Sequence, residues 1–159
     1  YITAQSKEVS GLEKTVLMGS DGMFSPQYLT GAGAAVKGTY LSSPDFSLFP
    51  GTYKTFSDKY KAKYGTMLAV FNGHAYDAAN IIFAAIEKVA VKDADGTLHI
   101  GRQALRDAIY ATKDFKGITG TLTCSQYGDC GAPVIAIYQV VDSNDKTWDP
   151  GKNPKKVYP

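Results

Sequence analysis

A chain of 159 residues with 44% hydrophobic and 20% charged residues is long enough for a real core and ordinary in composition for a globular protein. Its net charge of +2 provides no electrostatic case for binding nucleic acid or an anionic membrane. The most apolar stretch, residues 78–86, contains Asn80 and is far too short to span a bilayer.

The start of the chain lacks the features of a translation start. Tyr1 is not an initiator methionine, and no basic and then apolar signal region follows it. Residues 1–14 are instead typical of the end of a helix, with a few apolar side chains among polar ones. We therefore expect the chain to be the C-terminal piece of a longer protein.

A short strand followed by a glycine turn is the first indication of function. Residues 15–18 are apolar or β-branched, as in a buried strand, and Gly19 and Gly22 bracket the turn that follows. The Ser-Pro pair at 25–26 suits the start of a helix. This order places Asp21 at the carboxyl end of a strand, where open α/β sheets bind ligands. The alternative is that Asp-Gly is only a turn dipeptide.

The next segments predict a short helix, a strand and a longer helix. Residues 26–35 favour an imperfect helix, residues 38–41 a strand and residues 42–45 a loop. Pro50 then opens a helix that Gly65 ends, and aromatic side chains recur along it at helical spacing. Core packing explains these aromatic residues better than a cofactor site does.

The strongest helix signal covers residues 74–91. Its apolar positions follow the i, i+3, i+4, i+7 pattern of one buried stripe, made of Ala75, Ala78, Ala79, Ile82, Ala85, Ile86 and Val89. Asn72 is the better of two candidate N-caps, and the short apolar segment 67–71 leads into the helix.

The last third of the chain adds a helix and then changes to β patterns. A helix is expected over residues 101–113, and strands over residues 118–123 and 133–142. The lysine-rich end at 152–156 is expected to be a solvated tail. Because strands and helices alternate before this β-rich end, the sequence predicts an α/β fold.

The two cysteines, Cys124 and Cys130, lie six residues apart. Two thiolates cannot complete a structural zinc site, and the two histidines are far away without ligand spacing. The favoured interpretation is a small loop closed by a disulfide, which indicates an exported protein. The alternative is two free cysteines that happen to be close.

Motifs of catalysis and metal binding are missing from the sequence. Gly-Ser-Asp-Gly at 19–22 lacks the residue between glycine and serine that a nucleophile elbow requires, and there is no phosphate-binding Gly-Lys-Ser/Thr. The acidic turn at 93–96 fails as an EF-hand, because valine and arginine occupy positions that need acids. We expect no enzymatic activity, no cofactor and no metal.

Four stretches, in order and with matching spacing, carry a resemblance to a known family. They are Met-Gly-Ser-Asp-Gly at 18–22, Phe-Asn-Gly-His-Ala-Tyr-Asp-Ala-Ala at 71–79, the segment from Leu105 to Thr123, and Val-Ile-Ala-Ile-Tyr-Gln-Val-Val at 134–141. Over nearly its whole length the chain resembles the C-terminal part of type I periplasmic binding proteins. The specific resemblance is to the substrate-binding proteins of branched-chain amino acid ABC transporters.

The resemblance implies two α/β lobes of parallel-sheet type joined by hinge crossings. Residues 1–43 would end the second, C-terminal lobe, residues 44–116 would close the first, N-terminal lobe, and residues 117–159 would return to the second lobe. The N-terminal half of the family architecture is absent from this chain.

The resemblance also implies which residues bind the ligand. The family holds the ammonium of an amino acid with an acid in the loop that matches Ser20-Asp21, and a carboxylate makes a stronger, charge-assisted hydrogen bond. Phe71 matches an aromatic residue of the side-chain pocket, with ordinary core packing as the alternative. His74 lies near the same mouth and is a candidate contact, with a role at the start of the helix as the alternative. The partners of the ligand carboxylate would lie in the missing half.

The function implied is that of an exported solute-binding protein of an ABC importer, in the periplasm or outside the cell. It would bind an amino acid, branched-chain or related, between two lobes and deliver it to the permease subunits, without inserting into the membrane. The alternative is the ligand-sensing domain of a receptor or regulator with the same fold.

Overall fold

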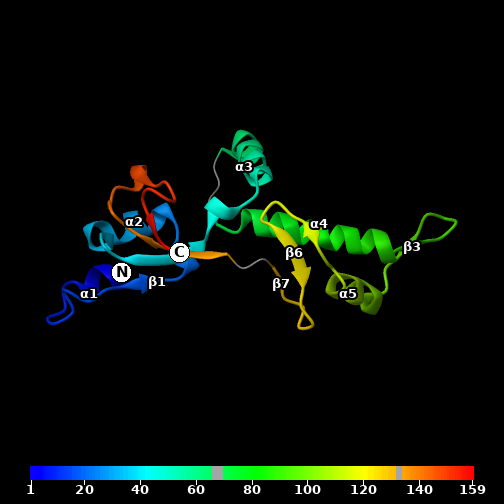
Figure 1. Cartoon of the computed structure of the whole chain (residues 1–159), viewed down its shortest axis with the longest axis horizontal. Helices are drawn as coiled ribbons and strands as arrows, with labels where there is room; N and C mark the ends of the chain where they lie inside the picture. Colours follow the sequence, from blue (N-terminus) through cyan, green and yellow to red (C-terminus); the bar gives the residue numbers. More distant parts are fainter. Residues whose placement is uncertain (66–69, 132–133) are drawn as a thin grey trace. The chain divides into compact units, whose positions relative to one another are not determined.

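A computed structural model of the chain describes residues 1–65, 70–131 and 134–159. Most of the predicted apolar segment 67–71 lies outside the described residues. The described residues divide into two compact units: unit 1 consists of residues 1–48, 70 and 134–159, and unit 2 of residues 49–65 and 71–131. In Figure 1, unit 1 is coloured from blue to cyan and from orange to red, and unit 2 is mainly green and yellow. The predicted lobe boundaries, after residues 43 and 116, stay a prediction.

Unit 1 is built on a four-stranded mixed sheet. Its strands are β1 (Met18–Gly19), β2 (Tyr40–Pro44), β8 (Ile135–Gln139) and β9 (Lys155–Tyr158), in the order β1-β2-β8-β9. β1 runs parallel to β2, and the other pairs are antiparallel. Side chains alternate along β8, so Ala136 and Tyr138 face the core. The sheet and its helices confirm the predicted α/β class.

Short helices pack around this sheet and close the core of unit 1. They are α1 (Ile2–Ser6), η1 (Asp21–Met23), α2 (Pro26–Ala32), η2 (Gly33–Val36), η3 (Phe46–Leu48) and η4 (Asp145–Thr147), where η marks 3-10 turns. The core cluster joins side chains from several of these elements: Phe24, Leu29, Ala32, Val36, Leu41, Ala136, Tyr138 and Val140. The Phe24 ring lies edge-on to the rings of Tyr138 and Trp148, at 4.9 and 5.1 Å between centroids.

Unit 2 combines three helices with small β-hairpins. The helices are α3 (Gly51–Tyr64), α4 (Asn72–Val89) and α5 (Arg102–Tyr110), and α4 packs on α5. The strands are β3 (Val91–Lys92) and β4 (Leu98–His99) in one hairpin, and β5 (Phe115–Lys116), β6 (Thr121–Cys124) and β7 (Cys130–Gly131) in a three-stranded sheet. As predicted, α3 follows Pro50 and ends at Gly65, whose φ of 85° is a left-handed conformation that favours glycine.

The buried face of α4 differs from the predicted stripe. The helix buries Gly73, Asp77, Ile81 and Ala85. Of the predicted stripe, Ala85 is buried, Ala79, Ile86 and Val89 are partly buried, and Ala75, Ala78 and Ile82 are exposed. Apolar periodicity does not detect a buried carboxylate such as Asp77, so it predicted the buried stripe on a neighbouring face of the helix. The N-cap is also different: Phe71 occupies it, without a side-chain hydrogen bond, and Asn72 is the first helical residue.

The prediction of a solvated lysine tail at 152–156 is wrong for all but Lys152, and Asn153 and Pro154 are buried. Lys155 and Lys156 belong to β9, which pairs with β8. The Lys156 ammonium binds the buried Asp45 carboxylate at 2.5 Å between Nζ and Oδ2. A segment that looks like a polar tail therefore forms an edge strand, because a buried acid supplies a partner for its lysine.

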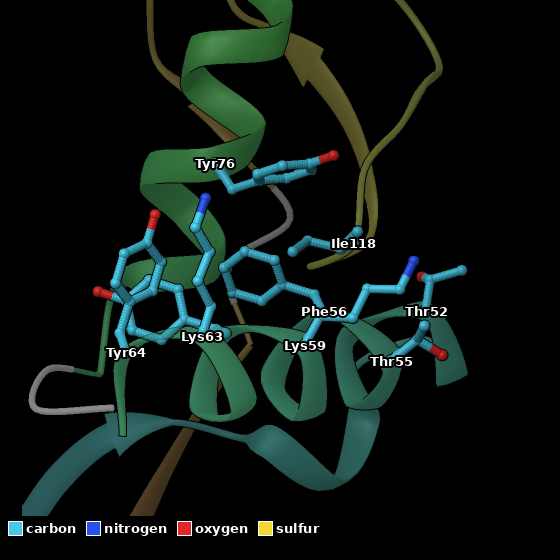
Figure 2. A pocket seen from close by; sticks show the side chains of 9 residues that line it. Thr52, Thr55, Phe56, Lys59, Lys63, Tyr64, Tyr76 and Ile118 are labelled. Carbon is cyan, nitrogen blue, oxygen red and sulfur yellow. The ribbon is translucent and has the colours of Figure 1, made fainter. Parts of the chain in front are cut away.

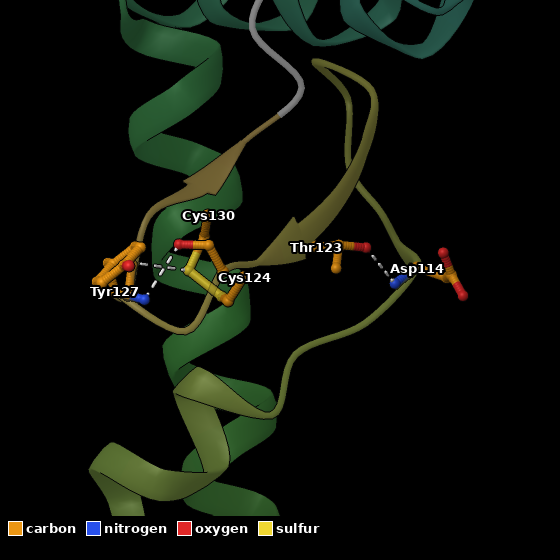
Figure 3. The surroundings of a disulfide bond; sticks show 7 residues. Asp114, Thr123, Cys124, Tyr127 and Cys130 are labelled. Carbon is orange, nitrogen blue, oxygen red and sulfur yellow. Dashed lines mark hydrogen bonds between the residues drawn. A yellow bond between two sulfur atoms is a disulfide. The ribbon is translucent and has the colours of Figure 1, made fainter.

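The disulfide prediction is confirmed, and the alternative of two free cysteines is excluded. Cys124 and Cys130 are bonded across the β6–β7 hairpin, where the two residues lie opposite each other in register (Figure 3). Close to this hairpin, the Asp114 amide donates to Thr123 Oγ1 at 3.0 Å, which holds the chain where Asp114 adopts a φ of 52°.

Candidate functional site

The loop at the carboxyl end of β1 presents an unpaired carboxylate. Ser20 is extended, with a φ of −84° and a ψ of 179°, and Asp21 begins the η1 turn, which the Met23 amide closes by donating to the Ser20 carbonyl at 2.9 Å. Asp21 is half-buried, and within the described residues its carboxylate has no hydrogen-bond or ion-pair partner. This group can therefore accept hydrogen bonds from a cation that reaches the sheet edge.

Gly19 leaves room for the Met23 side chain in this loop. A Cβ atom at this position would lie 2.5 Å from Met23 Sδ and 3.1 Å from Leu41 Cδ2. Glycine therefore lets Met23 lie over the end of β1 without shifting, and Met23 in turn packs on the core cluster. The position of Asp21 is thus tied to the core through the turn that it begins.

Phe71 and His74 lie in unit 2, at the start of α4. The Phe71 ring is exposed, and its centroid lies 5.3 Å from that of His74, edge-on. The Phe49 ring also packs against His74, with 5.5 Å between the two ring centroids. Phe71 is therefore an accessible ring at a helix start, which is compatible with the predicted pocket role.

His74 is held in an apolar setting that favours the neutral imidazole. Burial lowers the pKa of His74, and the nearby Asp77 carboxylate opposes this shift without reversing it. The Nδ1 atom is buried and has no hydrogen-bond partner among the described residues, and the same holds for Asn72 Nδ2. A neutral His74 offers a donor or an acceptor to a ligand, but not a charge.

The predicted site residues thus fall into two pairs. Ser20 and Asp21 lie together in unit 1, and Phe71 and His74 lie together in unit 2. The ligand-binding role of all four stays a prediction.

Asp77 is the most tightly bound polar group near the start of α4, and the sequence analysis assigned it no role. Its side chain is 1% exposed and accepts three hydrogen bonds, from the Ile118 amide at 2.9 Å, the Thr119 amide at 2.9 Å and Thr119 Oγ1 at 2.6 Å. The carboxylate fixes the turn at 117–119 to α4 one turn beyond His74. The sequence signal that could have revealed it is a carboxylate in the first half of a helix, four residues before the apolar Ile81 and eight before Ala85.

A second buried acid holds the end of β2 in unit 1. Asp45 is 1% exposed and accepts hydrogen bonds from Lys156 Nζ, from the Ser47 amide at 3.1 Å and from Ser47 Oγ at 2.6 Å. Burial raises the pKa of Asp45, but the hydrogen bonds from Lys156 and Ser47 outweigh it and hold the pKa below its ordinary value. Burial, with the Asp45 charge nearby, raises the pKa of Tyr138 to about 12, and its hydroxyl donates to the Pro44 carbonyl at 3.0 Å.

Two further features limit the chemistry of the part of the chain that the structure covers. No helix there is long and apolar enough to cross a membrane. Nor do three or more histidine, cysteine, aspartate or glutamate side chains gather there as they would around a metal ion.

The comparisons with known proteins agree with this architecture. The sequence matches the family described as Periplasmic binding protein over residues 4–145, and no curated protein matches it. It is similar to a leucine binding protein, LivK, from Thermotoga maritima, with 25% identity, a TM-score of 0.68 and coverage of 89% of this chain and 39% of that one.

Two other solved structures cover nearly all of the chain. LivJ, a branched-chain amino acid transporter substrate binding protein from Streptococcus pneumoniae in complex with isoleucine, is 22% identical with a TM-score of 0.67, over 99% of this chain and 41% of that one. A periplasmic binding protein type 1 from Bordetella pertussis Tohama I is also 22% identical, with a TM-score of 0.67. This match covers 99% of this chain and 43% of that one. The chain spans about two fifths of the length of these structures. It belongs to the periplasmic binding protein family and has the α/β fold of the type I members.

Proposed function

We propose that this chain is part of an extracytoplasmic solute-binding protein of an ABC importer, which binds an amino acid and delivers it to permease subunits. The branched-chain amino acids are the first candidate ligands, since LivK is a leucine binding protein and LivJ was solved with isoleucine. On the predicted lobe boundaries, most of unit 1 would belong to the second lobe of such a protein and most of unit 2 to the first. Carriers of this kind work by hinge closure around the ligand and catalyse no reaction.

The observation that supports this proposal most directly is the unpaired Asp21 carboxylate at the end of β1. An amino acid carries an ammonium group that must find a partner when it leaves water, because an unpaired buried charge costs several kcal/mol. Asp21 would accept the ammonium hydrogen bonds, with Ser20 beside it. Phe71 would contribute an apolar surface to the ligand side chain, with His74 at its edge.

The test is isothermal titration of the full-length protein with L-leucine and L-isoleucine. Asp21→Asn keeps the size of the side chain but removes its charge, so affinity should fall by roughly ten- to a thousandfold. Asp58→Asn is the matched control, because Asp58 is exposed on α3 and pairs with Lys54 on the same helix. Equal affinity of Asp21→Asn and the wild type would refute the role of Asp21.

The class of ligand needs a separate measurement. A thermal-shift screen of the wild-type protein against amino acids and small carboxylates would identify it, since a ligand that binds the folded state raises the melting temperature by mass action. No stabilisation by any amino acid would refute the proposed function itself.

A further inference from the structure

The α3 helix carries a row of aromatic rings that the core of unit 2 does not bury. Phe56, Tyr60 and Tyr64 recur four residues apart, with ring centroids 5.9 and 4.7 Å from one to the next. The Phe56 ring also lies 5.0 Å from the Tyr76 ring of α4. No residue of α3 is fully buried, so these rings keep accessible faces along one side of the helix.

A pocket of about 340 Å³ opens along this row of rings (Figure 2). The rings of Phe56, Tyr60 and Tyr76 and the Ile118 side chain supply its apolar surface. In Figure 2 the Lys59 and Lys63 side chains extend on either side of the Phe56 ring. The volume is at the lower end of the range for small-molecule sites, which corresponds to a ligand with a single ring.

The charge in this pocket is uncompensated. No carboxylate is among the side chains that line it, and neither Lys59 nor Lys63 forms an ion pair with any described residue. Lys54, on the same helix, does have an acidic partner in Asp58, at 2.6 Å. The Lys63 ammonium lies 5.3 Å from the centre of the Tyr64 ring, a cation–π distance that keeps it close to the aromatic row.

We propose that this pocket is a second ligand site, which binds an aromatic carboxylate. The ring of the ligand would pack against Phe56 and Tyr76, where aromatic pairs favour offset or edge-on contacts. Its carboxylate would accept hydrogen bonds from Lys59 and Lys63. A free amino acid is a poorer match, because no carboxylate in the lining pairs with its ammonium. The site lies within unit 2 and does not depend on Asp21.

The test uses the full-length protein saturated with the amino acid that its thermal-shift screen identifies, or without ligand if none is found. Protein NMR shifts are followed as phenylacetate, benzyl alcohol or phenethylamine is added. Phenylacetate should bind most tightly, since benzyl alcohol lacks the charge and phenethylamine carries the opposite one. Failure of the amino acid screen leaves this titration unaffected, so the two proposals fail separately.

Variants assign the binding to the pocket. Lys59→Gln with Lys63→Gln should weaken phenylacetate binding by about 3- to 20-fold, the range expected for two exposed ion pairs. Phe56→Leu should weaken phenylacetate and benzyl alcohol alike. Lys61→Gln is the control, because this lysine lies on α3 outside the pocket lining and should leave affinity unchanged.

Several results would overturn the proposal. They are no shift at about 10 mM phenylacetate, equal affinity for benzyl alcohol and phenylacetate, or unchanged affinity in the double lysine variant. Binding of an acidic peptide without binding of phenylacetate would also overturn it, since the surface would then recognise a protein segment. Melting temperatures of all variants close to the wild-type value show that the differences arise from the pocket.

Discussion

Replacing Asp77 by alanine should destabilise unit 2 by about 3–5 kcal/mol. The substitution removes the acceptor of three hydrogen bonds, from the amides of Ile118 and Thr119 and from the Thr119 hydroxyl. A buried donor left without a partner costs about 1–3 kcal/mol, and Thr119 is only 4% exposed. A loss of this size is a large part of the 5–15 kcal/mol that typically separates folded from unfolded domains.

The assay is urea unfolding followed by two signals. Far-UV circular dichroism reports mainly the long α-helices α3, α4 and α5 of unit 2, while the fluorescence of the single tryptophan, Trp148, reports the core of unit 1. Asp58→Ala is the control, because Asp58 is an exposed member of an i, i+4 ion pair on α3 and should change stability by about 0.5 kcal/mol or less. The reasoning fails if Asp77→Ala unfolds at the same urea concentration as Asp58→Ala.

A double-mutant cycle with Gly117 tests the geometry itself. A Cβ atom on Gly117 would lie 2.5 Å from Asp77 Oδ2, so Gly117→Ala should displace the carboxylate from its donors. In the Asp77→Ala background this clash is absent, and the added cost of Gly117→Ala should largely disappear. Additive effects of the two substitutions would show that the carboxylate does not occupy this position.

Three further outcomes are expected. Lys156→Met should cost about 3 kcal/mol, because it leaves the buried Asp45 carboxylate without its cation, and tryptophan fluorescence in urea would measure this. The folded-state pKa of Asp45 lies below its unfolded value, so its contribution to the free energy of unfolding is complete above about pH 4 and is lost as the pH falls through the lowered pKa. In Lys156→Met this loss should begin at higher pH. An unchanged dependence of stability on pH would contradict the pairing. Gly31→Ala should raise stability by up to about 1 kcal/mol, because a Cβ inside α2 meets no atom within 4 Å; a lower melting temperature would contradict this. Reducing Cys124–Cys130 should add about two daltons to the intact mass, and a mass unchanged by reductant would exclude the bridge. Reduction should also lower stability by about 2 kcal/mol, because the unfolded chain regains the conformational entropy that a short closed loop removes.

Local signals account for the elements that the sequence predicted well. Pro50 and Gly65 bracket α3, and the acidic turn at 93–96 lies between β3 and β4, because proline, glycine and aspartate restrict the backbone at their own positions. The ordered set of family motifs added the fold, which the match over residues 4–145 confirms. The disulfide followed from the short spacing of Cys124 and Cys130.

Contacts between distant segments account for what the sequence did not reveal. Asp77 meets Thr119 across 42 residues, and Lys156 meets Asp45 across 111 residues. Neither partner carries a local signal, so the predicted apolar stripe of α4 left Asp77 without a role and Lys156 was expected in a polar tail. Burying a charge is favourable only where the fold supplies its hydrogen-bond partners. The sequence by itself therefore determined the principal helices, the family and Asp21 as a candidate. The tertiary structure decided which charged groups are buried and which stay unpaired, because only folding brings their partners to them.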